Sequence, residues 1–221
     1  KDDAVRMYGK MNRFKRQLPL VIRPDVIPTD DGMVISELDS VPGGMGFTAN
    51  LSRVYAEFGD CIVGGAEGMV HGFAEMVRGV AGHERPCTAI TVSDEAGDYR
   101  PEMVWLAEEL RSIGLPAAAV HPRDLRYDDA TGVLMASGDE WVRVDVLYRF
   151  FELFDLRNVP KSDLFLYAAR KNDVAMTPPP KPYLEEKMLF SFLHHPALQP
   201  FWKQWLPEDA RAALGQAFPR T

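Results

Sequence analysis

The chain has 221 residues, enough for one large domain or two modest ones with a substantial hydrophobic core. Its formal net charge of −7 argues against a nucleic-acid backbone or an anionic membrane as the main partner, because the short basic cluster at residues 10–16 is too small to offset it. No apolar stretch approaches the roughly 20 residues that span a bilayer, so we expect a cytoplasmic protein.

The two cysteines, Cys61 and Cys87, suggest neither a disulfide framework nor a cysteine zinc site. We expect both to be core thiols. The charged residues 1–18 do not open with an initiator methionine, so we expect the sequence to begin partway along a longer protein.

The first predicted element is a β-hairpin. Residues 18–27 and 33–38 are rich in β-branched side chains, and the polar turn between them ends in Asp31-Gly32, a strong hairpin signal. Helical spacing follows at residues 50–58 and 66–80, where the second segment has one apolar stripe and is expected to face the core.

From residue 85 onward the pattern alternates between strand and helix. Strands predicted at residues 87–92 and 117–121 flank an amphipathic helix at residues 100–113, which is a βαβ signature and predicts two neighbouring parallel strands. Short strands at residues 125–127 and 133–136 then lead into a strand at residues 141–148. This strand would deliver three polar side chains to a strand end, where sites of α/β proteins lie: Tyr148, Arg149 and Glu152.

The last third begins with a helix predicted at residues 161–172 and a short strand at residues 174–176. The proline-rich residues 178–182 forbid regular structure until a helix opens near Tyr183, and this helix would carry Lys187. A final amphipathic helix is predicted at residues 207–218.

Four charged residues lie within the predicted hairpin, which is unusual for apolar strands. If the turn centres on Asp31, opposed residues lie equally far from it, so Asp25 faces Glu37 and Arg23 faces Asp39. All four side chains then project from one side of the sheet. The residues expected on the other side are Val26, Val34 and Leu38.

Two directly opposed carboxylates are destabilising, so this register calls for a cation between them. Carboxylate oxygens gathered in this way suit Mg²⁺, which takes the rest of its shell from water and substrate phosphates. Arg23 beside such a site would be well placed to grip a phosphate. The alternative is a solvated hairpin face with an ion pair between Arg23 and Asp39 and nothing bound.

These motifs resemble the circularly permuted ATP-grasp family, whose members include glutathionylspermidine synthetase-like ligases. The family shows an Arg-x-Asp pair and then, across a turn carrying Asp/Asn-Gly, a Glu-x-Asn followed by a small-residue loop. The pattern here reads Arg23-Pro24-Asp25, Glu37-Leu38-Asp39 and Pro42-Gly43-Gly44. The resemblance implies Asp25, Glu37 and Asp39 as Mg²⁺ ligands, and Arg23 as the group that contacts nucleotide or acyl-phosphate oxygens. The departure is Asp39, where Asn is usual, which adds a negative charge to the site.

Two further stretches match the family in order. Residues 99–156 resemble its inserted α/β module, including a Val-Asp-Val-x-Tyr-Arg motif, and residues 174–198 resemble its return into the nucleotide-binding half. The resemblance implies that Lys187 lies near ATP and that Arg149 and Glu152 line the cleft. The family pattern continues past residue 221 with a second ATP-contacting lysine and a Gly-rich loop, so we expect this chain alone to be inactive.

The sequence therefore predicts an α/β protein, a permuted ATP-grasp-like fragment with an inserted Rossmann-like module. Residues 1–84 would form the metal-binding hairpin and core helices, residues 85–158 the module, and residues 159–221 the start of the nucleotide-binding half. The implied function is an ATP- and Mg²⁺-dependent ligase that joins small-molecule or peptide-like carboxylates and amines through an acyl phosphate. The alternative from another class is a non-catalytic binding or assembly protein that retains a degenerate form of this fold.

Overall fold

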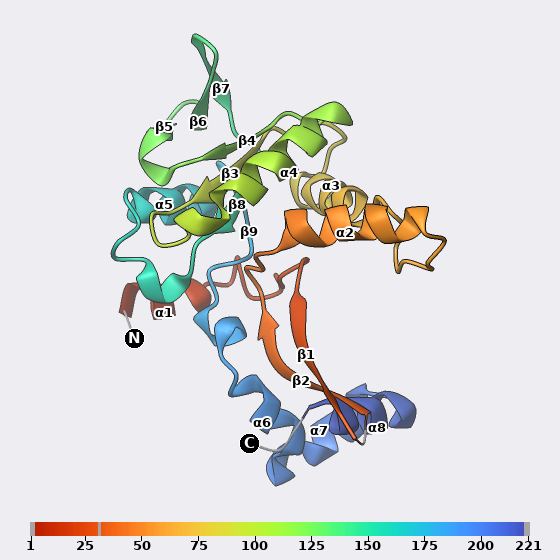
Figure 1. Ribbon diagram of the computed structural model, residues 1–221. Coiled ribbons are helices and arrows are strands. Elements are labelled where there is room, and N and C mark those ends of the chain that lie inside the picture. The colour runs from red at the N-terminus through yellow and green to blue at the C-terminus, as the bar shows by residue number, and fades with distance from the viewer. Residues whose placement is uncertain (1–2, 31, 219–221) are drawn as a thin grey trace.

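The computed structural model describes residues 3–30 and 32–218. At its centre lies a four-stranded sheet in the order β4-β3-β8-β9, in which every neighbouring pair is parallel (Figure 1). Its strands are β3 (Thr88–Val92), β4 (Ala117–Val120), β8 (Val146–Phe150) and β9 (Ala175–Thr177). Helix α4 (Arg100–Ser112) connects β3 to β4, which confirms the predicted βαβ unit and a mixed α/β fold with a parallel sheet.

Helices cover both faces of this sheet. Ala89 and Leu147 point to one face and pack against α5 (Ser162–Lys171), the short antiparallel strands and the N-terminal segment. Ile90 and Tyr148 point to the other face. That second face packs against α4, α3 (Gly68–Ala81) and the first turn of α2 (Met45–Glu57). Because both faces are buried, β3 and β8 read as continuous apolar runs rather than alternating ones.

A small antiparallel sheet lies beside the parallel one. It consists of β5 (Arg126–Asp128), β6 (Gly132–Ser137) and β7 (Glu140–Arg143). The single strand predicted at residues 141–148 is therefore wrong, because the chain changes sheet between β7 and β8. Asp145 makes this change: its N–H donates to the Cys87 carbonyl at 2.9 Å, and its Oδ2 accepts the Cys87 N–H at 2.9 Å.

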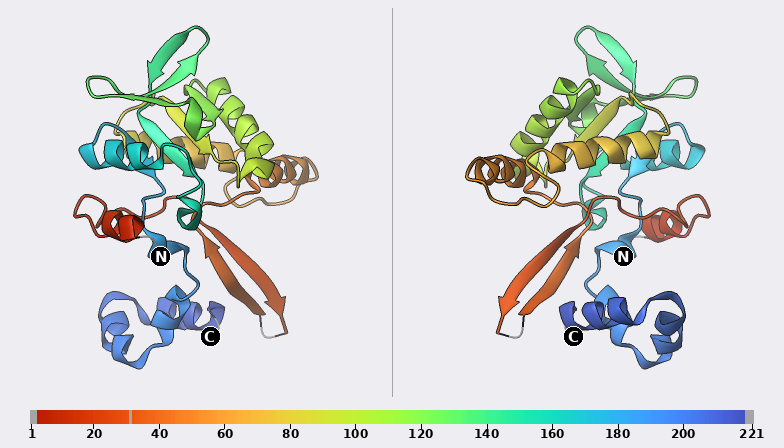
Figure 2. Two further views of the ribbon diagram at one scale, coloured as in Figure 1. Left: turned by 90° about the vertical axis from the view of Figure 1, so that its left-hand side faces the viewer. Right: turned by 90° about the vertical axis from the view of Figure 1, so that its right-hand side faces the viewer.

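The predicted hairpin forms an arm that leaves the sheet body (Figures 1 and 2). It consists of β1 (Arg23–Thr29) and β2 (Gly32–Asp39). Strand β2 lies beside the C-terminal helix α8 (Glu208–Ala217), which packs with α6 (Leu189–His194) and α7 (Gln199–Trp205). Leu38 lines an apolar pocket of about 240 Å³ together with Phe190 and Trp202, so the helices cover this face near Leu38, while Val26 and Met33 remain 46% and 67% exposed.

The continuous helix predicted to open near Tyr183 is also wrong. A 3₁₀ turn at Pro182–Glu185 is followed by Glu186 in an extended conformation, with φ −113° and ψ 123°, and α6 begins only at Leu189. Lys187 therefore lies in a connecting turn rather than on a helix. Apolar spacing alone could not reveal this break, because it depends on one backbone conformation.

Two short helices were not expected from the sequence: α1 (Asp3–Gly9) and α7. Helix α2 begins at Met45, five residues before the predicted start at residue 50, and the other predicted helices agree with the structure to within two residues at each end. The parallel sheet and its covering helices include parts of all three predicted divisions of the chain. Helix α3 belongs to residues 1–84, whereas α5 and β9 belong to residues 159–221.

The two thiols have different surroundings. Cys87 is half-buried beside β3, whereas Cys61 is exposed in the loop between α2 and α3, so the expectation of two core thiols is wrong for Cys61. The loop around it contains Gly59, Gly64 and Gly65, all with positive φ, which glycine adopts without strain. Across residues 3–30 and 32–218, no helix combines the length and the apolar character that crossing a bilayer needs.

Candidate functional site

The charged residues at the base of the hairpin face one another as predicted. Arg23 is opposite Asp39 and Asp25 is opposite Glu37, so the four side chains share one face of the ribbon. A bulge then shifts the register by one residue, and the extra residue on β2 is Ser36.

The bulge corrects the predicted register of the outer half of the hairpin. Thr29 pairs with Gly32 and Ile27 with Val34, so Val34 does not lie on the face expected for it. Val26 pairs with Ile35 instead. The equal spacing from Asp31 therefore holds only at the base of the ribbon, where the charged residues are.

Arg23 is the centre of this charged cluster. Its Nε donates to Asp25 Oδ1 at 3.0 Å, its Nη1 donates to the Gly43 carbonyl at 3.0 Å, and its Nη2 lies 3.3 Å from Asp39 Oδ2. Burial lowers the pKa of Arg23, but its hydrogen bond to Asp25 and the charge of Asp39 outweigh this and raise that pKa overall. The guanidinium is therefore charged and held in one orientation, while its side chain remains 43% exposed.

Lys187 joins the cluster from the far end of the chain. Its Nζ lies 2.9 Å from Glu37 Oε2. The two residues predicted as a nucleotide contact and a metal ligand thus meet in space, although one lies on β2 and the other before α6. With Lys187 and Arg23 present, each of the three hairpin carboxylates has a cationic neighbour.

The three hairpin carboxylates do not converge on one point where a metal ion could bind. Among the residues that the structure describes, no three Asp, Glu, His or Cys side chains converge closely enough to hold an ion. The carboxylates of Asp25 and Asp39 instead turn toward Arg23, and that of Glu37 turns toward Lys187. The assignment of these acids as Mg²⁺ ligands therefore stays a prediction.

The loop after β2 connects the charged cluster to the sheet body. Asp39 Oδ1 accepts the Val41 N–H at 2.8 Å, which fixes the start of the loop. At Gly43, a Cβ atom would lie only 2.3 Å from a ring carbon of Tyr99, so only glycine allows this contact. The same glycine accepts the hydrogen bond from Arg23. Tyr99, just before α4, was missed from the sequence, because nothing in its local pattern indicates the partner.

The buried hydroxyl group of Tyr148 lies close to this junction. Tyr148 on β8 is 1% exposed, and among the described residues its hydroxyl has no hydrogen-bond partner. Burial raises the pKa of Tyr148 far above its ordinary value; the nearby charge of Arg149 lowers it and that of Asp39 raises it. A neutral phenol therefore lies within electrostatic range of the hairpin base.

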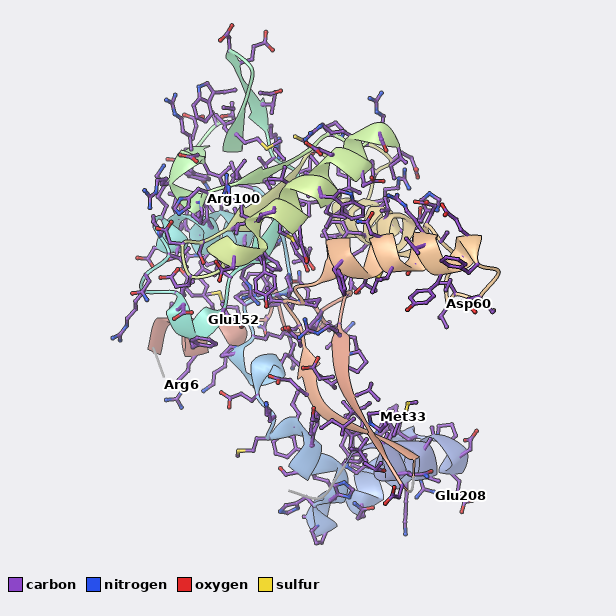
Figure 3. The ribbon with its side chains drawn as sticks, viewed as in Figure 1. Arg6, Met33, Asp60, Arg100, Glu152 and Glu208 are labelled. Atoms are coloured by element: carbon purple, nitrogen blue, oxygen red, sulfur yellow. The ribbon has the colours of Figure 1, made fainter. Side chains whose placement is uncertain are left out.

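The two other predicted cleft residues follow Tyr148. Arg149 is fully buried, and its guanidinium donates from Nε to the Pro178 carbonyl at 3.3 Å and from Nη1 to the Phe151 carbonyl at 2.5 Å. These bonds tie the end of β8 to the chain leaving β9. Glu152 is half-buried, and Figure 3 labels it at the lower end of the sheet body, where the hairpin leaves. Their roles toward a nucleotide stay predictions.

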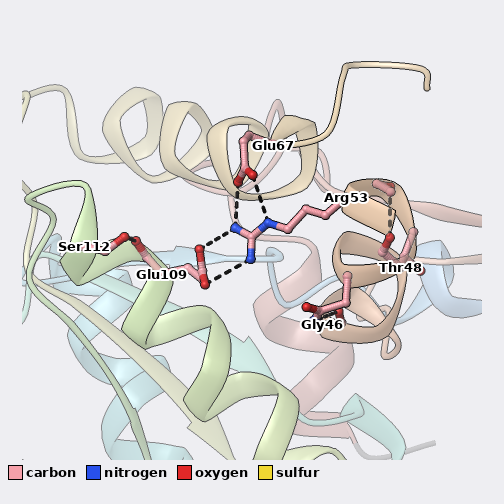
Figure 4. A network of polar contacts seen from close by, with 8 residues as sticks. Gly46, Thr48, Arg53, Glu67, Glu109 and Ser112 are labelled. Carbon is pink, nitrogen blue, oxygen red and sulfur yellow. Dashed lines mark hydrogen bonds and ion pairs between the residues drawn. The ribbon is translucent and has the colours of Figure 1, made fainter. Parts of the chain in front are cut away.

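A separate network fixes the helix that follows the glycine loop. Arg53 on α2 donates through Nε and Nη2 to both carboxylate oxygens of Glu67 at 2.9 and 2.6 Å. Its Nη1 and Nη2 also reach the two oxygens of Glu109 on α4, at 3.2 and 2.6 Å (Figure 4). One guanidinium thus links α2 to α4 and to the start of α3, which holds α2 and the loop before it against the sheet body.

Comparison with known proteins gives no closer assignment. No family model matches the chain, and no curated protein matches it. The family resemblance therefore rests on the order and spacing of the motifs in this sequence.

Proposed function

We propose that this chain is part of an ATP- and Mg²⁺-dependent ligase that joins a carboxylate to an amine through an acyl phosphate. The observation that carries the proposal is the convergence of Lys187 on Glu37, beside Arg23. The hairpin motif with Glu37 and the distant segment with Lys187 lie in one charged cluster. Both were matched to the nucleotide site of one family by their order in the sequence alone.

Arg23 would supply the phosphate contact. Its three contacts to Asp25, Asp39 and the Gly43 carbonyl leave a further N–H group on each Nη atom. Since the guanidinium is already oriented, little conformational freedom is lost when a phosphate oxygen binds to it. Lys187 is 65% exposed and would provide a second, more mobile positive charge.

The acids fit Mg²⁺ by their chemistry, because this ion prefers carboxylate oxygens and keeps several waters. Asp25 and Glu37 have side chains 42% and 43% exposed, so both carboxylates have room to turn from their present partners. Three carboxylates against two cationic side chains leave the cluster with a residual negative charge that favours a divalent cation. When bound, Mg²⁺ would neutralise phosphate charge during transfer.

In such a reaction, a carboxylate oxygen of the first substrate attacks the terminal phosphorus of ATP, and ADP leaves. The amine of the second substrate then attacks the acyl carbon, forming the amide bond as inorganic phosphate leaves. Both steps develop negative charge on phosphate oxygens, and fixed cations such as Arg23 stabilise it best where they need not reorient.

The test measures Mg²⁺-ATP binding by calorimetry and ATP hydrolysis in the presence of mixed carboxylates and amines. This chain should bind Mg²⁺-ATP weakly without turnover, and any longer native form should hydrolyse ATP when both substrates are present. Asp25→Ala and Glu37→Ala should abolish that activity, whereas Asp60→Ala, which removes an exposed acid outside the cluster, should not. Equal Mg²⁺-ATP binding by the short and long forms, with no metal-dependent turnover, would count against the ligase.

The second candidate is a non-catalytic binding or assembly protein. One observation favours it: each hairpin acid already has a cationic neighbour, Arg23 or Lys187, so the charged face forms its ion pairs with nothing bound. This candidate predicts that the long form of the protein binds no nucleotide. It also predicts that the charge-removing variants of Asp25 and Glu37 change only stability.

A further inference from the structure

A second cavity lies away from the charged cluster. It has a volume of about 450 Å³ and lies between the N-terminal segment, the ends of α3 and α5, and β9. In Figure 2 the N-terminal segment runs beneath α5 and beside the chain that leaves β9. The volume falls within the range of small-molecule sites in proteins. None of the charged residues of the hairpin lines it.

One part of the cavity wall is positively charged. Arg13 and Arg16 line it together with Gln17 and Asn172, and no Asp or Glu is among its lining residues. Arg13 Nη2 donates to the side-chain oxygen of Asn172, which holds its guanidinium at the wall. In a chain with a net charge of −7, this is a locally cationic site, and it favours an anionic group.

The rest of the wall is apolar. Leu18, Leu20, Val80, Val174 and Met176 line it, and two of them, Leu18 and Leu20, are 62% and 58% exposed. Covering such exposed aliphatic side chains with an apolar group removes them from water and so favours binding. A ligand that suits both parts of the wall therefore has an anionic head and an apolar body.

The rim of the cavity is fixed in advance by a buried lysine. Lys181 is only 1% exposed, and its Nζ donates to the Lys15 carbonyl at 3.0 Å and to the Gln17 carbonyl at 2.5 Å. Phe14, also 1% exposed, anchors the same segment in the core. Because the loop bearing both arginines is held at these points, binding would cost little ordering of the chain.

We propose that this cavity binds a small amphipathic carboxylate, with its carboxylate on Arg13 and Arg16 and its aliphatic or aromatic body against Leu18, Leu20 and Val80. A planar carboxylate suits the paired donors of a guanidinium. The proposal does not rest on the ligase function, since it concerns a different set of residues and needs neither ATP nor metal.

The experiment uses the whole chain and titrates it with octanoate by calorimetry, with octylamine and octanol as probes of equal chain length. Octanoate should bind with one site per chain, and the amine and the alcohol should bind at least about tenfold more weakly, as expected when a charged hydrogen bond is lost. Arg13→Gln and Arg16→Gln should each weaken octanoate binding to a similar degree. Lys203→Gln, which removes an exposed charge on α7, should leave it unchanged.

A further variant tests the apolar wall without risk to the core. Leu20→Glu places a carboxylate at an exposed position of the wall and should abolish octanoate binding while the protein stays folded. The proposal is overturned if octanoate and octylamine bind equally, if wild type does not bind octanoate, or if the two arginine variants bind it as well as wild type. Circular dichroism of each variant tests whether it is folded, so that a loss of octanoate binding can be assigned to the cavity.

Discussion

Lys187 Nζ lies 2.9 Å from Glu37 Oε2, and this contact ties the connection before α6 to the hairpin strand β2. Both side chains are well exposed, so the pair adds little to the stability of the fold. An exposed cation that adds little to stability is free to exchange one anionic partner for another. The pair is therefore not a structural clamp of the fold.

Replacement of Lys187 by Met should separate these roles. The free energy of unfolding should change by less than about 1 kcal/mol, as for an exposed ion pair. Mg²⁺-ATP affinity should fall by about tenfold, because a charged contact to phosphate is lost. Denaturant unfolding and calorimetry measure the two quantities, with Lys203→Met as the matched control. Unchanged nucleotide affinity would remove Lys187 from the proposed site.

Gly43→Ala should disturb the junction between the hairpin and the sheet body. The added Cβ would lie 2.3 Å from the Tyr99 ring, so the loop or the ring must move, at a cost of about 1 to 3 kcal/mol. Gly72→Ala, at an open position within α3, should instead stabilise the protein slightly. In the double variant Gly43→Ala/Tyr99→Ala, the second change should recover part of the first loss. Purely additive losses would show that the two residues do not contact each other.

Arg53→Met should loosen the packing of α2. The side chain loses its contacts to Glu67 and Glu109, which are partly exposed, so we expect a loss of about 1 to 2 kcal/mol after allowance for solvent screening. Arg53→Lys should recover only part of this, since an ammonium cannot bind two carboxylates in the same paired geometry. Thermal unfolding of the three proteins under equal conditions measures the difference.

The ion pair between Arg53 and Glu67 predicts that the stability of the protein depends on pH. The hydrogen bond from Arg53 lowers the pKa of Glu67 despite the opposing effect of burial. The contribution of the ionised Glu67 to the stability of the fold is therefore complete above the ordinary glutamate pKa of about 4.3. It is lost as the pH falls through the lowered pKa of Glu67. The stability difference between wild type and Arg53→Met should be constant from neutral pH down to the ordinary glutamate pKa, and should shrink as the pH falls from there through the lowered value. A difference that grows on acidification would contradict the assignment.

The two thiols should react at very different rates. Burial, with a contribution from Asp145, raises the pKa of the Cys87 thiol to about 11, so about one molecule in a thousand carries its thiolate at pH 8. Cys61 is exposed. A disulfide reagent at pH 8 should label one thiol per chain quickly, and Cys61→Ser should remove that fast phase. In denaturant both thiols should react; a fast phase that survives in Cys61→Ser would contradict this prediction.

Local sequence patterns determined most of the elements of this protein. The Asp31-Gly32 signal and the β-branched runs beside it predicted the hairpin. The predicted pairing of Asp25 with Glu37 is found because the bulge at Ser36 offsets a turn that pairs Thr29 with Gly32. The βαβ unit around α4 was equally predictable, since a parallel pair joined by an amphipathic helix has one common arrangement.

Other features depended on contacts between distant parts of the chain. Asp145 moves the chain from one sheet to another by binding the backbone of Cys87, and the extended Glu186 interrupts a pattern that reads as one helix. The bulge at Ser36 likewise leaves no signal in the spacing of apolar residues. Each is a single backbone conformation that the spacing of apolar residues does not specify.

The charged cluster shows the same division. The sequence by itself determined that Arg23 and Asp25 would share one face of their strand, and Glu37 and Asp39 one face of theirs, because alternate side chains of a strand point the same way. The bulge at Ser36 then brings the two pairs to the same side of the hairpin. Only the tertiary structure decided that Lys187 would reach Glu37 and that Tyr99 would lie on Gly43. Those contacts arise when α6 and α4 pack against the arm and the sheet, and packing between distant segments follows the shape and burial of whole elements rather than any local pattern.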